Sequence, residues 1–400
     1  MINSDVLERP VQSEASEFQT SPVLTITGAH TIHDGFQGFL PPLLPLLIEK
    51  LALSKTQAGL LSSFTLWPSL TQPFMGLIAD RKDLRWAVVL APAVTGAVMS
   101  MVGITPTYSL LAALLLIAGF STAFFHAVAP VMIGALSGRK IGRGMSFWMV
   151  GGELGRTLAP IIAVAAVGYL TLTGLPILMV AGFLTSIILY FRLRSVAYIP
   201  ANDGKVVNLP LVLRQMLPVL IPVMFILIAR SFIAQGMPLY LPTFLTERGS
   251  SLWFAGASLS IMQIAGVAGA MLGGTISDRL GRRMIMVVST IATSILFFVF
   301  TSSTGWVQLP ILLLLGFSSL SINPVIQAVV QENFPENRAL ANGIYMLFNF
   351  GVNAISVVLM GIVGDKLGLQ WAYYLSAGIL LLGLPFIYML PRDKNSGSLS

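Results

Sequence analysis

Cysteine is absent from the 400-residue sequence, and histidine occurs only three times. A disulfide-bonded scaffold is therefore excluded, and the residues that most often form structural zinc sites are nearly missing. Charge is also scarce, because Asp, Glu, Lys and Arg together make up 10% of the chain. A soluble domain carries about 25% charged residues, so this chain has too few charges to cover a water-exposed surface.

Hydrophobic residues are abundant instead, at 55% of the chain, and the mean hydropathy is +0.84. This apolar content excludes a disordered chain and indicates an integral membrane protein. The apolar runs are long and continuous, as in 110–117 and 311–317, whereas a β-barrel would show short alternating segments. Backbone groups in lipid must bond within their own segment, so the sequence predicts an all-α membrane protein.

The number of helices follows from the length of the chain. A spanning helix needs about 20 apolar residues and a short connection, so 400 residues hold about a dozen transmembrane helices. Twelve apolar spans are predicted at about 24–48, 56–79, 86–105, 108–136, 143–170, 174–193, 213–245, 252–275, 284–303, 308–331, 338–364 and 370–390.

These spans divide into two predicted six-helix bundles, at 23–195 and 211–390. Between them lies a polar segment at 196–210, which contains Pro, Gly and Asn and is predicted to be a central cytoplasmic loop. Residues 1–22 lack the order of a signal peptide and are predicted to be a disordered cytoplasmic tail. Residues 391–400 form a second predicted cytoplasmic tail.

The distribution of Lys and Arg predicts the orientation. With both termini inside, the inner segments hold about four times as many Lys and Arg as the outer loops, where the basic residues are Lys50, Lys55, Arg248 and Lys366. This places a multi-pass protein in the inner (plasma) membrane. The net charge of +7 is explained by these inner flanks. Nucleic-acid binding is not expected, because no basic stretch carries interleaved aromatic residues.

The two halves repeat one another with a period of about 197 residues. The segment Gly76-Leu-Ile-Ala-Asp80-Arg81 recurs as Gly274-Thr-Ile-Ser-Asp278-Arg279, and Gly119-Phe-Ser recurs as Gly316-Phe-Ser. Two pseudo-symmetric six-helix halves are typical of a rocking transporter, whose substrate site lies between the halves near the membrane midplane.

The second repeated segment extends to Gly274-x-x-Ser277-Asp278-Arg279-x-Gly281-Arg282-Arg283. This run resembles the loop signature of the major facilitator superfamily, between its eighth and ninth helices. The first copy, from Gly76 to Arg85, is degenerate. The resemblance implies a twelve-helix secondary transporter in which both loops act as gates that hold the inner side shut. The predicted gating residues are Gly76, Asp80, Arg81, Gly274, Asp278, Arg279 and Arg282. The two aspartates are expected to bond helix N-termini, and Arg81 and Arg279 to add ion pairs.

A narrower resemblance is to the fosmidomycin-resistance branch of that superfamily. It is carried by Phe125-His126, by Ser137-Gly138 and by Gly151-Gly152-x-x-Gly155-x-x-x-x-Pro160. The chain departs from the pattern at Ala127, Glu153, Arg156 and Ala159, where the branch has Pro, Asn, a small residue and Gly. The resemblance implies drug or metabolite efflux by proton antiport. The glycines are expected to let helix five approach a neighbouring helix closely.

Ionisable residues inside the spans are candidates for function, because each costs about 2.5–3.5 kcal/mol on insertion scales. They are His30, His33, Asp34, His126, Glu153, Arg156 and Arg230. Asp34, Glu153 and His33 are predicted to couple protons. A structural ion pair of Asp34 with an arginine and a metal site of His30, His33 and Asp34 are alternatives. For His30, a solvated place near the inner end of its helix is favoured.

The predicted substrate-binding residues are Arg230, Arg156, His126, Gln37, Gln235 and Asn323. Either arginine can hold a phosphonate, phosphate or carboxylate with two hydrogen bonds. Glu153 and Arg156 are one helical turn apart, so an i,i+3 salt bridge is an alternative, and proton loading of Glu153 would then free Arg156. Arg230 has an ion pair with Asp34 as its alternative. For His126 the alternative is a bond to a neighbouring backbone, and the amides could instead join helices.

The sequence therefore predicts a proton-coupled secondary transporter, not an enzyme, that exports a drug or small organic anion or zwitterion by antiport. No cofactor and no metal are expected. The proton gradient is the predicted energy source, because no Gly-x-x-x-x-Gly-Lys-Ser/Thr run exists to bind ATP. The expected partners are the substrate, protons and the lipid bilayer, and the protein is expected to be a monomer. A symporter importing an organic anion, and a metal- or lipid-moving facilitator, are the alternatives.

Overall fold

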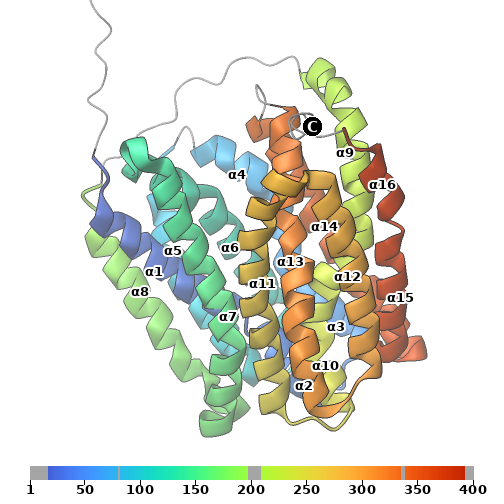
Figure 1. The fold of residues 1–400 in the computed structure, drawn as a ribbon. Helices are drawn as coiled ribbons and strands as arrows, with labels where there is room; N and C mark the ends of the chain where they lie inside the picture. Colours follow the sequence, from blue (N-terminus) through green and yellow to red (C-terminus); the bar gives the residue numbers. More distant parts are fainter. Residues whose placement is uncertain (1–16, 80–81, 197–208, 335–337, 392–400) are drawn as a thin grey trace, which may run out of the picture.

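The structure is a computed structural model that describes residues 17–79, 82–196, 209–334 and 338–391. The secondary structure of these residues consists of α-helices joined by short 3-10 and π-helical turns, without a β-strand. The prediction of an all-α membrane protein is confirmed (Figure 1).

The first half contains α1 (Thr20–Gln37), α2 (Leu40–Leu51), α3 (Lys55–Leu66), α4 (Gln72–Ala79), α5 (Arg85–Met101), α6 (Tyr108–Leu136), α7 (Ile141–Gly174) and α8 (Met179–Leu193). The second half contains α9 (Leu209–Ser231), α10 (Met237–Glu247), α11 (Leu252–Leu280), α12 (Arg282–Ser302), α13 (Gln308–Asn333), α14 (Arg338–Leu367), α15 (Leu369–Leu381) and α16 (Leu384–Met389). In Figure 1, α1 and α5 to α8 of the first half lie on one side of the molecule and α9 and α12 to α16 on the other, while α2 and α3 lie beside helices of the second half.

Several of these helices are consecutive segments of one span. The pairs α1 and α2, α3 and α4, α9 and α10, and α15 and α16 each follow one another along a predicted span, so the described helices account for all twelve predicted spans. Among the described residues, nine stretches are long and apolar enough to cross a membrane, and the longest, Gly138–Leu193, contains both α7 and α8. The breaks have a physical cause in proline, which lacks the backbone N–H of a continuous helix. Pro41 and Pro42 follow the break after α1, and Pro238 follows the π-helical turn Phe232–Gly236.

The predicted segment boundaries need two small corrections. α1 begins at Thr20, inside the predicted tail 1–22, and α9 begins at Leu209, inside the predicted loop 196–210. Pro22 does not prevent an early start of α1, because the first four N–H groups of a helix have no partner within it. The remainder of the predicted tails and of the central loop lies largely outside the described residues.

The internal repeat of the sequence is present in the packing of the helices. A Cβ atom added to Gly119 of α6 would lie 2.8 Å from the carbonyl oxygen of Phe64 in α3. A Cβ added to Gly316 of α13 would lie 2.1 Å from the carbonyl oxygen of Met262 in α11. Both glycines and both carbonyls are related by the period of the repeat, so each half uses the same close contact between its second and fourth spans.

The two halves are joined at one end of the molecule. The described chain begins and ends at the other end, which we call the terminal end; its counterpart is the opposite end (Figure 1). One apolar core includes residues of both halves, such as Leu43 and Leu44 of α2 and Phe244 of α10. Two further cores each belong to a single half, one containing Val88 and the other containing Val329. The shared core holds the halves together, whereas the other two stabilise each half separately.

Polar contacts between the halves are concentrated on α3. The Asp365 carboxylate of α14 accepts hydrogen bonds from the Lys55 and Thr56 backbone N–H groups, at 2.7 and 2.9 Å, and from the Thr56 hydroxyl at 2.6 Å. The Ser63 hydroxyl donates to the Ala354 carbonyl at 2.5 Å. Where both partners are described residues, the hydrogen bonds and ion pairs seen between the halves involve α3, including the Lys55–Glu247 ion pair at 2.9 Å. Asp365 caps the N-terminus of α3, where backbone donors and the helix dipole favour a carboxylate.

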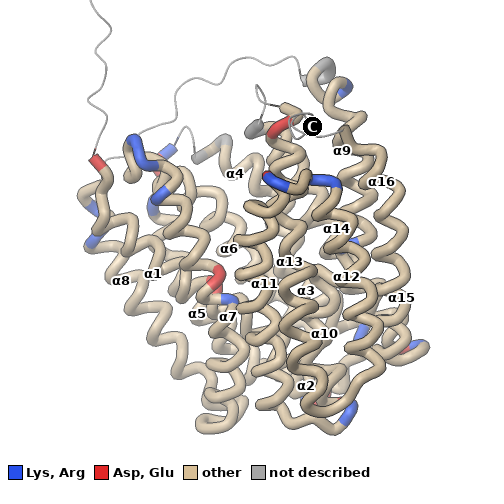
Figure 2. The backbone as a smooth tube through the Cα atoms, viewed as in Figure 1, with Lys and Arg blue, Asp and Glu red and all other residues tan. Residues whose placement is uncertain are grey.

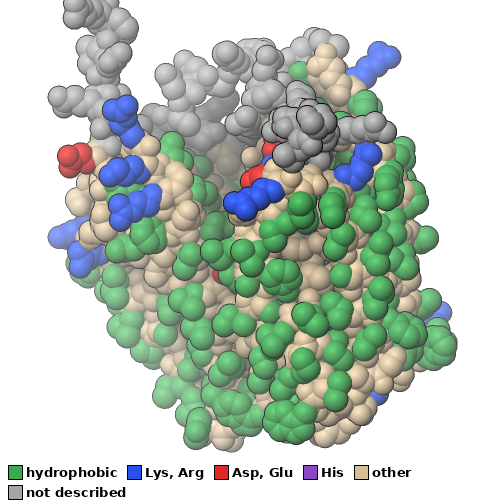
Figure 3. Space-filling model, viewed as in Figure 1, with side chains coloured by type: hydrophobic (Ala, Val, Ile, Leu, Met, Phe, Trp, Pro, Cys, Tyr) green, Lys and Arg blue, Asp and Glu red, His purple; other side chains and the backbone are tan. Residues whose placement is uncertain are grey.

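The outer surface matches a membrane environment. Hydrophobic side chains cover the middle of the molecule, and charged side chains lie mainly toward its ends (Figure 3). Lys and Arg gather at the terminal end, while both signs of charge also occur at mid-height on α7 (Figure 2). The charges on α7 therefore need partners inside the protein.

The glycines of α7 determine how closely it packs against α1. A Cβ atom added to Gly155 would lie 2.4 Å from the carbonyl oxygen of Thr31, and one added to Gly151 would lie 2.6 Å from that of Thr27. The predicted close approach of helix five to a neighbour is confirmed, and the neighbour is α1. This contact brings the charged residues of α7 against the polar face of α1.

We predict that Gly155→Ala destabilises the protein, because the new methyl group collides with a backbone oxygen that cannot rotate away. Overpacking of this kind costs about 1–3 kcal/mol. The measurement is the midpoint of thermal unfolding in detergent, together with the monodisperse fraction in size-exclusion chromatography. Gly142→Ala on the same helix is the control, since nothing lies within 4 Å of its added Cβ. Equal unfolding midpoints for the two variants would contradict the packing of α7 on α1.

We also predict that Asp365→Ala increases access to the interface between the halves, because α3 loses three hydrogen bonds across it. The chain has no cysteine, so a single Ser63→Cys substitution reports access through the rate of maleimide labelling. The rate should rise severalfold in the Asp365→Ala background. Glu247→Ala is the control with a small effect, because its ion pair is solvent-exposed. An unchanged rate for Asp365→Ala would show that this carboxylate does not hold the halves together.

Candidate functional site

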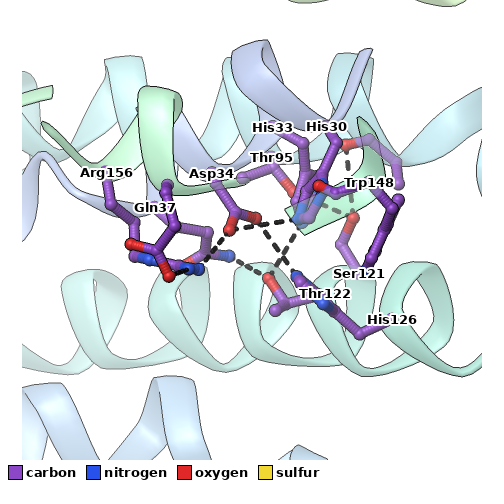
Figure 4. Close-up of polar contacts among 12 residues, drawn as sticks. His30, His33, Asp34, Gln37, Thr95, Ser121, Thr122, His126, Trp148 and Arg156 are labelled. Carbon is purple, nitrogen blue, oxygen red and sulfur yellow. Dashed lines mark hydrogen bonds and ion pairs between the residues drawn. The ribbon is translucent and has the colours of Figure 1, made fainter. Parts of the chain in front are cut away.

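One face of α1 carries four polar residues that lie inside the first half. His30, His33, Asp34 and Gln37 are spaced so that they lie along neighbouring turns of one helix face. The first three are at most 3% exposed, although they are polar or ionisable. They point toward α6 and α7 and make polar contacts with both helices (Figure 4). Buried groups of this kind require partners, and these partners define the site.

Asp34 is at the centre of these contacts. Its Oδ2 lies 2.6 Å from Nη1 of Arg156 and 3.2 Å from Nε2 of His30, and its Oδ1 lies 3.1 Å from Nε2 of His126. The structural ion pair of Asp34 with an arginine is confirmed, with Arg156 as the arginine. A pair of Asp34 with Arg230 is wrong, because Arg230 has other partners in the second half. His126 contacts this carboxylate rather than a neighbouring backbone.

Arg156 joins two carboxylates on two helices. Its Nη2 lies 2.5 Å from Oε1 of Glu153, one turn earlier on α7, while its Nη1 contacts Asp34 of α1. The i,i+3 salt bridge left open from the sequence is confirmed. The side chain of Arg156 is 39% exposed and that of Glu153 is 26% exposed, whereas that of Asp34 is 4% exposed. The chain of charges thus runs from a buried carboxylate to groups that a solute can reach.

The side chain of His30 on α1 is buried against α7, so its interpretation as a solvated histidine is wrong. Its Nδ1 lies 2.9 Å from the carbonyl oxygen of Trp148, and its ring stacks on the Trp148 ring at 3.5 Å between centroids. The physical reason is Gly152 of α7, where an added Cβ would lie 2.6 Å from Cε1 of His30. The missing side chain at that position leaves room for the imidazole.

His33 and Gln37 meet at a residue that sequence analysis missed. Nε2 of His33 lies 3.3 Å from the hydroxyl of Thr122, and the Gln37 amide donates to the same hydroxyl and, at 3.1 Å, to the Ala118 carbonyl. The His33 ring also stacks on Phe125 at 4.4 Å. The available signal was spacing, because Thr122 precedes His126 by one turn of α6.

The second half contains a different polar site around Arg230 of α9. Nη2 of this buried arginine donates to Oδ1 of Asn323 at 2.7 Å and to the Ser319 carbonyl at 3.0 Å, both on α13. The structure thus brings together two predicted substrate-binding residues, Arg230 and Asn323. The ion pairs of the described residues do not include Arg230, so neutral acceptors alone meet its charge. Gln235 lies half-buried in the neighbouring π-helical turn.

The predicted gating loops are described in part. Asp80 and Arg81 lie outside the described residues, and Gly76 lies in α4. In the first loop, the Arg85 guanidinium contacts Asp83 at 2.5 Å and holds the pKa of that carboxyl below its usual value.

In the second loop, Asp278 pairs with Arg282 at 2.5 Å, whereas Arg279, which was predicted to add ion pairs, is exposed. Gly281 has φ 93°, a conformation that suits glycine and turns the chain so that Arg282 faces back toward α11. Arg282 also contacts Glu332 of α13 at 2.7 Å. Gly274 lies nearby on α11, where an added Cβ would lie 3.8 Å from Pro324 of α13. These contacts tie together three helices of the second half.

A metal ion is an unfavourable occupant of the first site. The structure groups His30, Asp34 and His126, whose ligand atoms lie within 4.8 Å of one another; the set considered from the sequence had His33 in place of His126. The Arg156 guanidinium, 2.6 Å from Asp34, already supplies the positive charge. A divalent cation there would be repelled at short range in a poorly screened environment.

Comparisons with known proteins agree with the fold and the repeat. The sequence model of the Major Facilitator Superfamily matches residues 26–346 and 265–400. The fosmidomycin resistance protein of Escherichia coli (strain K12) is 22% identical over 379 residues, which cover 92% of both chains. The multidrug resistance protein MdtG of Salmonella typhimurium is 23% identical over 362 residues, covering 85% of this chain and 88% of that protein.

Solved structures show the same fold. A bacterial homologue of the human lysosomal transporter Spinster, in an inward-facing and occupied conformation, gives a TM-score of 0.81 at 14% identity. The match covers 93% of this chain and 97% of that chain. A D-xylose–proton symporter gives a TM-score of 0.76 at 16% identity, and the match covers 94% of this chain and 98% of that chain.

We predict that Asp34 and Arg156 are energetically coupled. Asp34→Asn should cost less stability in the Arg156→Gln background than in the parent, by about 0.5–3 kcal/mol, because the ion pair is then already broken. The measurement is a double-mutant cycle of unfolding free energies in detergent. The pair Asp34→Asn and Arg230→Gln is the control and should be additive, since these residues do not pair. Additivity for Asp34 with Arg156 would show that their contact contributes nothing to stability.

Proposed function

Because the chain belongs to the Major Facilitator Superfamily of secondary transporters, we propose that it is a proton-coupled antiporter that exports a small organic anion or zwitterion. The relatives named for fosmidomycin resistance and multidrug resistance support export. The Lys- and Arg-rich terminal end (Figure 2) supports an orientation with both termini in the cytoplasm. The protein is a multi-pass membrane protein, and its proposed location is the inner membrane.

The observation that carries this proposal is the unequal charge of the two halves. In the first half, Asp34 and Glu153 share one cation, Arg156. In the second half, Arg230 is paired with neutral acceptors. A zwitterion between the halves would neutralise the charge on both sides, with its anionic group on Arg230 and its cationic group beside the two carboxylates. An anion uses the Arg230 site alone.

Antiport follows when the substrate and the proton compete for the same carboxylates. A cationic group of a zwitterion that binds beside Glu153 and Asp34 disfavours protonation there, and a bound proton disfavours that group equally. The site is then loaded with substrate or with a proton, which is the condition for exchange. Because Asp34 is buried and Glu153 is accessible, the competition takes place at the accessible edge of the site.

A second candidate, symport of an organic anion into the cell, is favoured by one observation. Glu153 holds Arg156 at 2.5 Å, so protonation of Glu153 would release the guanidinium for an anion. Proton and anion would then bind together. The direction of coupling separates this candidate from antiport.

The test uses the purified protein in proteoliposomes with an imposed pH gradient. A thermal-shift screen of anionic, zwitterionic and cationic compounds, with fosmidomycin included, first selects the probe that stabilises the protein most. For antiport, the labelled probe should accumulate when the lumen is acidic, and a protonophore should abolish the accumulation. Accumulation under an acidic exterior would establish symport instead. Transport that responds to neither gradient would overturn proton coupling.

We further predict that Arg230→Gln weakens binding of an anionic or zwitterionic probe by about 10- to 100-fold, the loss expected for one charge-assisted hydrogen-bond pair. The measurement is the dissociation constant from the thermal-shift titration. Arg192→Gln is the control, because Arg192 is exposed and contacts Ser21 on the outside of the first half. An unchanged dissociation constant for Arg230→Gln would exclude Arg230 from the substrate site.

A further inference from the structure

The charges of the first-half site do not cancel. Two carboxylates, Asp34 and Glu153, contact one guanidinium, that of Arg156. With all three ionised, one negative charge remains within the membrane-spanning part of the protein. An uncompensated charge is unfavourable there, and one bound proton removes it.

The hydrogen bonds of His30 indicate where that proton is. The Trp148 carbonyl oxygen can only accept, so Nδ1 of His30, 2.9 Å away, must carry a hydrogen and donate it. The other ring nitrogen, Nε2, lies 3.2 Å from Oδ2 of Asp34. If Nε2 carried no hydrogen and Asp34 were ionised, two electron-rich atoms would lie this close together in a buried place. A proton on Nε2 turns the repulsion into an ion pair between the imidazolium and the carboxylate.

We propose that His30 is the carrier of the coupled proton, as an imidazolium held between the Trp148 carbonyl and the Asp34 carboxylate. The proposal rests on the proton coupling proposed above and names the residue that performs it. The proton belongs on His30 rather than on Asp34, because two further donors stabilise the ionised carboxylate. These are Nη1 of Arg156 at 2.6 Å and Nε2 of His126 at 3.1 Å.

The groups around His30 are consistent with one added proton. On α6, the rings of Phe125 and His126 lie 5.7 and 5.0 Å from the His30 ring between centroids. On α7, the Trp148 ring covers the imidazole, and Glu153 and Arg156 follow within two turns. On α1 itself, His33 bonds to Thr122 of α6.

The two other helices packed on α1 direct their charged groups elsewhere. Arg85 of α5 donates to the Leu193 and Val196 carbonyls and pairs with Asp83. Arg192 of α8 donates to the Ser21 hydroxyl, and Tyr190 of α8 packs against Phe191. The carboxylate that faces His30 is therefore that of Asp34.

Release of the proton changes the contact between α1 and the rest of the half. When Nε2 passes its proton to the Asp34 carboxylate and on to the accessible edge of the site, the nitrogen lone pair and the again ionised Oδ2 of Asp34 repel each other at the distance seen here. A cationic group of the substrate beside the carboxylates removes that repulsion by replacing the lost charge. His30 thus links the presence of substrate to the presence of the proton without touching the substrate.

The test of the protonation state is nitrogen NMR of the full-length protein with ring-¹⁵N-labelled histidine. The chain has three histidines, so His33→Gln and His126→Gln samples assign the signals. At pH 7, both ring nitrogens of His30 should be protonated, and Nε2 should lose its hydrogen in the Asp34→Asn variant. A single protonated nitrogen on His30 in the parent would overturn the proposal. The spectrum needs no transport, so this outcome is separate from the failure of proton coupling itself.

The functional test compares two modes of transport in proteoliposomes, with the probe selected by the thermal-shift screen. His30→Gln should lose accumulation driven by an acidic lumen but keep exchange of labelled for unlabelled probe, which needs no net proton movement. A structural role alone would impair both modes equally. Thr25→Ala is the control and should keep both, because the Thr25 hydroxyl donates to the Ser21 carbonyl of its own helix. Accumulation by His30→Gln with the lumen-pH dependence of the parent would overturn the proposal.

Discussion

The arrangement of the first half depends on one guanidinium. Arg156 contacts Glu153 on its own helix and Asp34 on α1, and each of the three would be unfavourable alone in a membrane span. The pair can form because the glycines of α7 let its backbone approach α1 closely. The glycines and the charged residues of α7 thus depend on each other. Without the close approach the guanidinium could not reach Asp34, and without the guanidinium the carboxylates would repel each other.

The two halves share a scaffold but differ in their chemistry. Gly119 and Gly316 make equivalent contacts with carbonyl oxygens, so the packing of the repeat is retained. The polar residues have diverged, because the first half has carboxylates and histidines where the second has Arg230 and Asn323. The proposed zwitterionic substrate would meet opposite charges on its two sides if it binds between these halves. The proposal of a substrate with separated charges therefore rests on this asymmetry rather than on any single residue.

The sequence was sufficient for the spans and the repeat, and it offered the contact of Glu153 with Arg156 as one of two alternatives, since these depend on local spacing and hydropathy. It was not sufficient for contacts between helices. Whether Asp34 pairs with Arg156 or with Arg230 depends on how each helix is rotated about its axis. Either pairing would neutralise the buried carboxylate, so charge alone does not decide between them. His30 was misplaced because its burial is set by Gly152 and Trp148, which belong to another helix. Hydropathy along α1 contains no information about that neighbour.

The break after α1 connects the charged site with the contact between the halves. Asp34 lies four residues before Gly38, the residue that follows the last residue of α1. Beyond this break, α2 contributes Leu43 and Leu44 to the core shared with the second half. Backbone breaks absorb the angular changes of rocking motions, because they lack the continuous hydrogen bonds of a helix. A change in the packing of α1 on α7 therefore alters the direction in which α2 leaves the break. Under the proposed function, a proton gained or lost beside Asp34 would act on the contact between the halves through this one span.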